Sequence, residues 1–178
     1  MHPSPGRAVT MSIAGLAGLG SQRNRVASAP VRCLLADELP VVRPTPVAMS
    51  VDPAPQYVRR VRKVARAWLR QMCRMPEGRV ESTLVVVSEL LTNALRYGNS
   101  ASLEYLNWSP QPGVIRIEIG NGTTAPTPQP TQAAPLAESG RGLFLVDQLV
   151  TELRGEWDYC EDGTTAWVCV PINDEHPA

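Results

Sequence analysis

The sequence predicts an α+β fold, a two-layer sandwich in which a mostly antiparallel mixed sheet is covered by helices on one face. Three observations support this prediction. Two segments with helical spacing of apolar residues lie in the first half of the chain, and the apolar period changes to two beyond residue 100. Hydrophobic residues make up 43% of the 178 residues, which is enough for one core.

The ordered domain is expected to span residues 46–172. Residues 1–45 are rich in Pro, Ala, Ser, Gly and Arg, which predicts a disordered leader, and residues 173–178 a loose tail. The apolar stretch after Arg7 resembles a signal peptide, but it is short and broken by Gly, Thr and Ser. No stretch of about 20 apolar residues could span a membrane. We therefore expect a cytoplasmic protein without a membrane contact.

The first predicted element is a short edge strand over residues 46–51. Asp52–Pro53 is a helix-start signal, and the segment as far as Met72 carries apolar residues at helical spacing with arginines on the other face. A second helix is predicted over residues 80–97. Its apolar residues extend most of the way around the axis, so it should lie buried against the sheet and end at Gly98.

The remaining elements follow from alternation and turn residues. A hairpin is predicted from strands over residues 102–108 and 114–119, followed by a long loop over residues 120–140. A short helix over residues 142–150 and two last strands over residues 152–160 and 164–172 complete the domain. Loops as long as 120–140 are often functional lids.

Charge and cysteine usage exclude several classes of protein. Lys plus Arg and Asp plus Glu number 17 each, so no net charge favours nucleic acid or an anionic membrane. The four cysteines form no CxxC pair and both histidines lie near the chain ends, which argues against zinc and for reduced thiols.

Glu89 and Asn93 are unusual polar residues in the second helix. They are four residues apart and therefore share a face among aliphatic neighbours. Burying them without partners would cost several kcal/mol, on the order of a lost hydrogen bond or more. Two interpretations stay open: a solvent-facing side of the helix, or a carboxylate that takes a proton beside an amide oxygen that binds Mg²⁺.

Two glycine-containing segments are further candidates. Ser139–Leu143 places two glycines around an arginine where a helix begins, which suits phosphate binding by free N–H groups. It could equally be a hinge and a helix cap. Ile119–Gly122 follows a predicted strand, where the Asn121 amide could recognise a base edge or simply form a turn.

Read together, these segments resemble the GHKL (Bergerat-fold) ATPase superfamily, closest to the bacterial anti-sigma-factor serine/threonine kinases. SELLTNALRYG resembles the N box, IEIGNGTTAP the G1 box and SGRGLFLVDQL the G2 box. GTTAWVCVP resembles the final strand pair. The resemblance covers residues 47–172 and implies the histidine-kinase-like ATP-binding fold.

The resemblance implies roles for individual residues. Glu89 matches the general base, and Asn93 matches the Mg²⁺ ligand that bridges the phosphates. Gly140 and Gly142 match the phosphate cradle, with Arg141 beside it as a charge partner. The remaining nucleotide-binding candidates belong to the same boxes and the last strand pair: Asn121, Gly122, Leu143, and Thr165 or its neighbour Thr164.

Two positions depart from the family pattern. Asn121 stands where the G1 box has an aspartate that accepts a hydrogen bond from adenine, and this change should weaken binding by about 1–2 kcal/mol, roughly ten-fold. Tyr97 stands where the N box usually ends in histidine, and Tyr does not titrate near neutrality. The loop 123–139 is proline-rich and lacks a clear glycine hinge.

The resemblance implies an ATP-dependent kinase that phosphorylates a serine of a small antagonist protein and controls a sigma factor. The alternative is a degenerate GHKL domain that binds a partner protein with weak or no nucleotide binding. The family also suggests a homodimer. The arginine-rich helix up to Arg74 could bind nucleic acid, but zero net charge and the lack of a DNA-reading motif favour a solvated face that docks an acidic protein.

Overall fold

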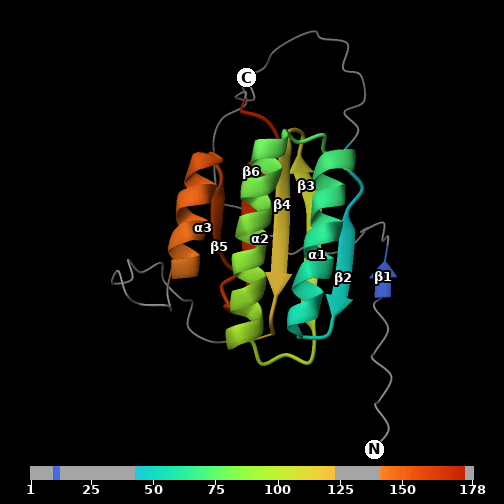
Figure 1. Ribbon diagram of the computed structural model, residues 1–178, viewed down its shortest axis with the longest axis vertical. Helices are drawn as coiled ribbons and strands as arrows, with labels where there is room; N and C mark the ends of the chain where they lie inside the picture. Colours follow the sequence, from blue (N-terminus) through green and yellow to red (C-terminus); the bar gives the residue numbers. More distant parts are fainter. Residues whose placement is uncertain (1–9, 13–42, 123–140, 175–178) are drawn as a thin grey trace, which may run out of the picture.

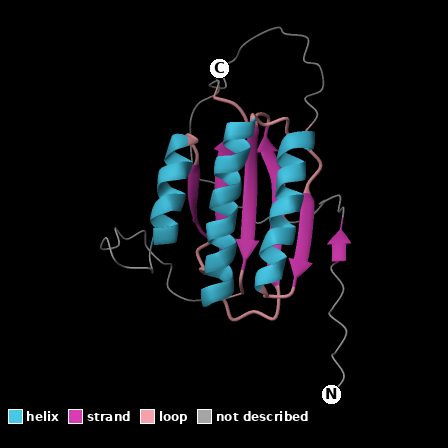
Figure 2. Ribbon diagram, in the orientation of Figure 1, coloured by secondary structure: helices cyan, strands magenta, loops and turns pink. Residues whose placement is uncertain are grey.

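The computed structural model describes residues 10–12, 43–122 and 141–174. Helices cover one face of a six-stranded sheet with the order β1-β2-β3-β4-β6-β5 (Figures 1 and 2). Each pair of neighbouring strands is antiparallel. The predicted α+β sandwich is confirmed, and among the described strands the sheet contains no parallel pair.

The strands agree with the alternating segments of the sequence, with three corrections. Their bounds are β1 (Thr10–Ser12), β2 (Val47–Val51), β3 (Leu103–Gln111), β4 (Val114–Gly120), β5 (Glu156–Tyr159) and β6 (Thr165–Pro171). β1 pairs with β2, so β2 is not an edge strand, and a short piece of the expected disordered leader is a strand. β5 is shorter than predicted because the preceding helix extends to Glu152.

The helices begin and end close to their sequence signals. They are α1 (Pro55–Ala67), which continues into one π-helical turn η1 (Trp68–Met72), then α2 (Glu77–Tyr97) and α3 (Arg141–Glu152). Asp52 is not the cap of α1, since Ala54 is the N-cap and Pro55 the first helical residue. α2 starts three residues before the predicted Val80, directly after Pro76.

The core lies between the helices and the sheet, with α2 in the middle (Figure 1). Leu84, Val87 and Leu91 of α2 are almost fully buried, as are Ile115 and Ile117 of β4. The buried residues of β4 alternate along the strand, because one face packs on the helices. The prediction that α2 lies buried against the sheet is confirmed.

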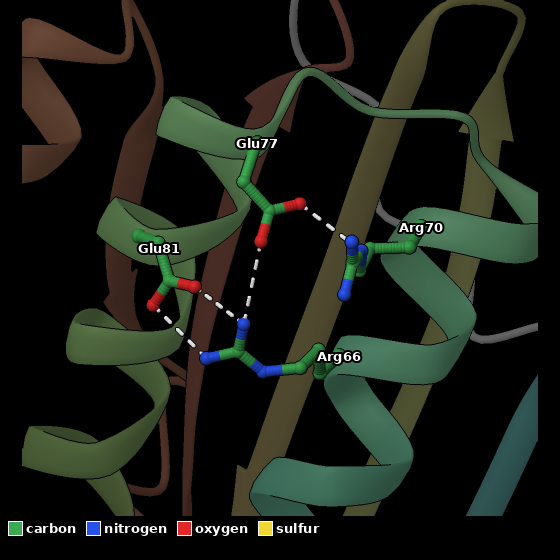
Figure 3. A network of polar contacts seen from close by, with 4 residues as sticks. All are labelled: Arg66, Arg70, Glu77 and Glu81. Atoms are coloured by element: carbon green, nitrogen blue, oxygen red, sulfur yellow. Dashed lines mark hydrogen bonds and ion pairs between the residues drawn. The ribbon is translucent and has the colours of Figure 1, made fainter.

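An ion-pair network joins α1 and η1 to the start of α2 (Figure 3). Arg66 contacts Glu81 through both terminal nitrogens, including an Nη2–Oε2 distance of 3.0 Å, and also contacts Glu77. Arg70 pairs with Glu77 at 3.0 Å. All four side chains are largely exposed, so the network orients the two helices more than it stabilises them.

Replacing Glu81 by Gln should lower the urea midpoint slightly at pH 7 and not at all in acid. The hydrogen bond from Arg66 lowers the pKa of Glu81. A lowered carboxyl pKa stabilises the fold above the ordinary pKa, and that stabilisation is lost as the pH falls through the folded pKa. Urea unfolding between about pH 2.5 and pH 7 measures the effect, and Glu152→Gln is the control at an exposed position. A difference that is the same at every pH would contradict this explanation.

Candidate functional site

Glu89 and Asn93 lie one turn apart on the side of α2 that faces α3. Both side chains are half-buried, whereas their neighbours Leu90 and Leu91 are each only 1% exposed. The two helices pack side by side (Figure 1). The polar pair therefore lies between two helices rather than on an open solvent face.

Gly142, in the first turn of α3, lies directly against this pair. A Cβ atom built on Gly142 would be 2.6 Å from Oε2 of Glu89 and 4.0 Å from Oδ1 of Asn93. Only glycine leaves the carboxylate in its place, because a methyl group would occupy that space. The structure thus brings the predicted N box and G2 box together at one point.

The first turn of α3 supplies further polar groups beside Glu89 and Asn93. Main-chain N–H groups in the first turn of a helix have no intrahelical acceptor, so they can bind an anion. Arg141 is exposed at this end, whereas the Leu143 side chain is 7% exposed and belongs to the core. Leu143 can therefore contribute only its main chain to a ligand. Gly140 lies outside the described residues.

Asn121 lies at the end of β4, close to the C-terminal end of α2. Its main-chain N–H donates to the carbonyl oxygen of Thr164 at 2.9 Å. A Cβ atom on Gly98, which ends α2, would be 3.0 Å from Cβ of Asn121. Because Asn93 is five residues before Gly98, this contact places Asn121 beside the end of α2 that is nearer to Asn93.

Thr165 and Thr164 have different surroundings. The Thr164 hydroxyl and main-chain N–H donate to Oδ1 of Asp162, at 2.8 and 3.0 Å, and these bonds lower the pKa of Asp162. Thr165 pairs with Gly120 across the sheet, and its Oγ1 is 3.5 Å from a Cβ position built there. The Thr164 side chain thus stabilises the β5–β6 turn, whereas the Thr165 hydroxyl lies beside Gly120 at the end of β4.

Gly122 has a positive φ of 64°. A Cβ atom there would be 2.8 Å from Cβ of Ser100. Glycine is thus required for both its conformation and its packing. The contact with Ser100 was not predicted, because nothing in the sequence pairs the segment after α2 with the end of β4.

A family model described as the histidine kinase-like ATPase domain matches residues 51–170, more than half of the chain. The chain belongs to this family. The match begins in β2 and ends in β6, so the ATPase domain includes α1, α2, α3 and the site described above. No curated protein matches the chain. Among the described residues, no helix is long and apolar enough to cross a membrane.

Membership of the ATPase family implies ATP binding, typically with Mg²⁺. The residues present fit that ligand. A carboxylate and an amide oxygen meet at a glycine that leaves room for close approach. Carboxylate and carbonyl oxygens are the ligand types that Mg²⁺ prefers, and main-chain N–H groups in the first turn of a helix suit phosphate.

Replacing Gly142 by Ala should impair nucleotide turnover at least about ten-fold with little loss of stability. The new methyl group meets the end of a flexible side chain, so Glu89 can turn away instead of forcing the helices apart. ATP turnover and thermal unfolding measure the two effects. Gly78→Ala on α2 is the matched control, since nothing lies within 4 Å of a Cβ there. A variant with normal turnover would show that Glu89 is not needed in its present position.

Proposed function

We propose that this protein is an ATP-dependent serine/threonine kinase that phosphorylates a serine of a small antagonist protein and thereby controls a sigma factor. The observation that carries the proposal is the meeting of Glu89 and Asn93 with Gly142 at the N-terminus of α3. Family membership supports the ATP-binding part. The protein substrate and the sigma factor rest on the resemblance of the motifs.

The residues of the site divide the chemistry between them. Bound ATP–Mg²⁺ would supply the phosphoryl group. Asn93 would hold the ion through its amide oxygen, and the first-turn N–H groups of α3, with Arg141, would hold the phosphates. Glu89 would take the proton of the acceptor hydroxyl, for which a half-buried carboxylate beside the phosphate site is well placed.

Label transfer tests this proposal. The full chain is incubated with labelled ATP, Mg²⁺ and a candidate antagonist protein encoded in the same operon. Label on a serine of the antagonist supports the kinase. Absence of transfer while ATP and the antagonist both bind would rule the kinase out.

The second candidate is a non-catalytic GHKL module that binds a partner protein, and Asn121 favours it. By the resemblance of the motifs this side chain stands at the base-recognition position, and it carries no charge. Asn121→Asp should raise ATP affinity about ten-fold, because a carboxylate accepts a stronger hydrogen bond from an amino group. Calorimetric titrations with ATP, ADP and GTP on both proteins measure this. If the aspartate variant binds no better, our account of position 121 is wrong.

The expected setting is the cytoplasm, with a homodimer as one form of assembly. Sedimentation of the purified protein alone would test the homodimer, and sedimentation with the sigma factor would test that complex. The arginine-rich surface of α1 is proposed to face an acidic protein rather than nucleic acid. A steep salt-dependent affinity for DNA would contradict that assignment.

A further inference from the structure

A cavity lies at the opposite end of the sheet from Asn121 and Thr165. It has a volume of about 410 Å³, within the range of small-molecule sites. Its walls come from the η1–α2 turn, the β3–β4 hairpin, the end of β6 and the segment before β2. Ile172 closes one side, held by a hydrogen bond from its N–H to the carbonyl oxygen of Gly113 at 2.7 Å.

Arg74, on the cavity wall, has an unusual backbone conformation. Its φ of 52° lies in the left-handed region, and it follows Cys73, the C-cap of the π-helical turn η1. The N–H of Met75 donates to the carbonyl oxygen of Leu69 at 3.0 Å, which closes the helix end around Arg74. Glycine is preferred at such a position, so an arginine there costs about 1 kcal/mol of strain. Strained residues and π-helical turns both concentrate at functional sites.

The cavity combines positive charge with apolar surface. Arg43 and Arg74 line it, and within the described residues neither forms an ion pair. Arg43 is oriented by a hydrogen bond from Nη1 to the carbonyl oxygen of Pro110 at 3.3 Å. The apolar part is formed by Pro44, Met72, Pro112 and Ile172. Met72 is 49% exposed, which is high for an apolar side chain. Its flexibility would let it cover a bound ligand.

No acidic group opposes this charge among the described residues that line the cavity. Cys73 is the remaining titratable group of the wall, and burial raises the pKa of its thiol to about 12. The thiol is therefore neutral at physiological pH and adds no negative charge.

We propose that this cavity binds a small anion with an apolar body, held by the guanidinium groups of Arg43 and Arg74. An arginine guanidinium can donate two parallel hydrogen bonds to the two oxygens of a carboxylate or to two oxygens of a phosphate monoester. The apolar wall takes the rest of the molecule. The site is separate from the ATP site and does not depend on the proposed kinase activity.

Titrations of the full chain with three probes of similar shape test the proposal. Phenyl phosphate and phenylacetate carry the two anionic groups, and benzyl alcohol is the neutral control. Binding is followed by the amide signals of Met72, Arg74 and Gly113. Stronger binding of one anion identifies the headgroup. Equal binding of benzyl alcohol, or no binding of either anion, would overturn the proposal.

Two matched variants separate charge from folding. Arg74→Gly removes the guanidinium and relieves the strained φ, so it should fold at least as well and bind the preferred anion at least ten-fold more weakly, by about one lost charged hydrogen bond. Arg154→Gly is the control, because Arg154 also has a positive φ of 55° but its Nη1 donates to the carbonyl oxygen of Asp174. Unchanged affinity in Arg74→Gly, or equal loss in Arg154→Gly, would overturn the proposal.

Discussion

Glu89→Gln is expected to lower phosphoryl transfer by about 10²–10⁴-fold, the usual contribution of a general base. The amide has the same shape as the carboxylate and cannot accept the proton. Because Asn93 and the start of α3 stay unchanged, ATP–Mg²⁺ should bind nearly as before. Single-turnover label transfer gives the rate, and a calorimetric titration gives the affinity.

Glu81→Gln is the matched control for this variant. It removes a carboxylate from the same helix two turns away, where Glu81 pairs with Arg66 instead of facing Gly142. Its transfer rate should equal that of the natural protein. Rapid transfer by Glu89→Gln would show that another group, or none, takes the proton.

Arg79→Met is expected to reduce the free energy of unfolding by about 2–4 kcal/mol. Arg79 is 6% exposed, and its Nη2 donates to the carbonyl oxygens of Leu153 at 2.8 Å and Pro171 at 2.7 Å. Nη1 pairs with Asp174. The side chain thus ties the start of α2 to the ends of α3 and β6. Methionine would fill the space and leave two carbonyl groups without a donor.

Asp174→Asn separates the ion pair from these carbonyl bonds. Asp174 is 73% exposed, so its loss should cost less than about 1 kcal/mol. Urea unfolding of both variants measures the difference. A cost for Asp174→Asn as large as that for Arg79→Met would place the stability in the ion pair rather than in the backbone contacts.

The sequence predicts well those features that depend on local periodicity. The buried face of α2 and the alternation of β4 follow from residue spacing, the stop at Gly98 follows from the glycine itself, and all three are observed. The start of α1 was misplaced because two prolines, Pro53 and Pro55, offer the same local signal. Tertiary pairing decides such choices.

Contacts between distant segments could be predicted only through the family resemblance. The spacing of Glu89 and Asn93 is also compatible with a solvent-exposed helix face. The contact with Gly142 shows that the two residues face α3 instead. The G2-box resemblance made Leu143 a nucleotide-binding candidate, but its side chain belongs to the core, and the motif alone does not reveal this. The strained Arg74 has no local signal, since glycine would be expected there.

ATP–Mg²⁺ is expected to bind where α2 meets the start of α3. Calorimetric titration of ATP with Mg²⁺ into the natural protein and Asn93→Ala tests it most directly. We predict affinity in the micromolar range for the natural protein, on the order of −8 kcal/mol, and its loss in the variant. No binding to the natural protein, or equal binding to Asn93→Ala, would contradict the account.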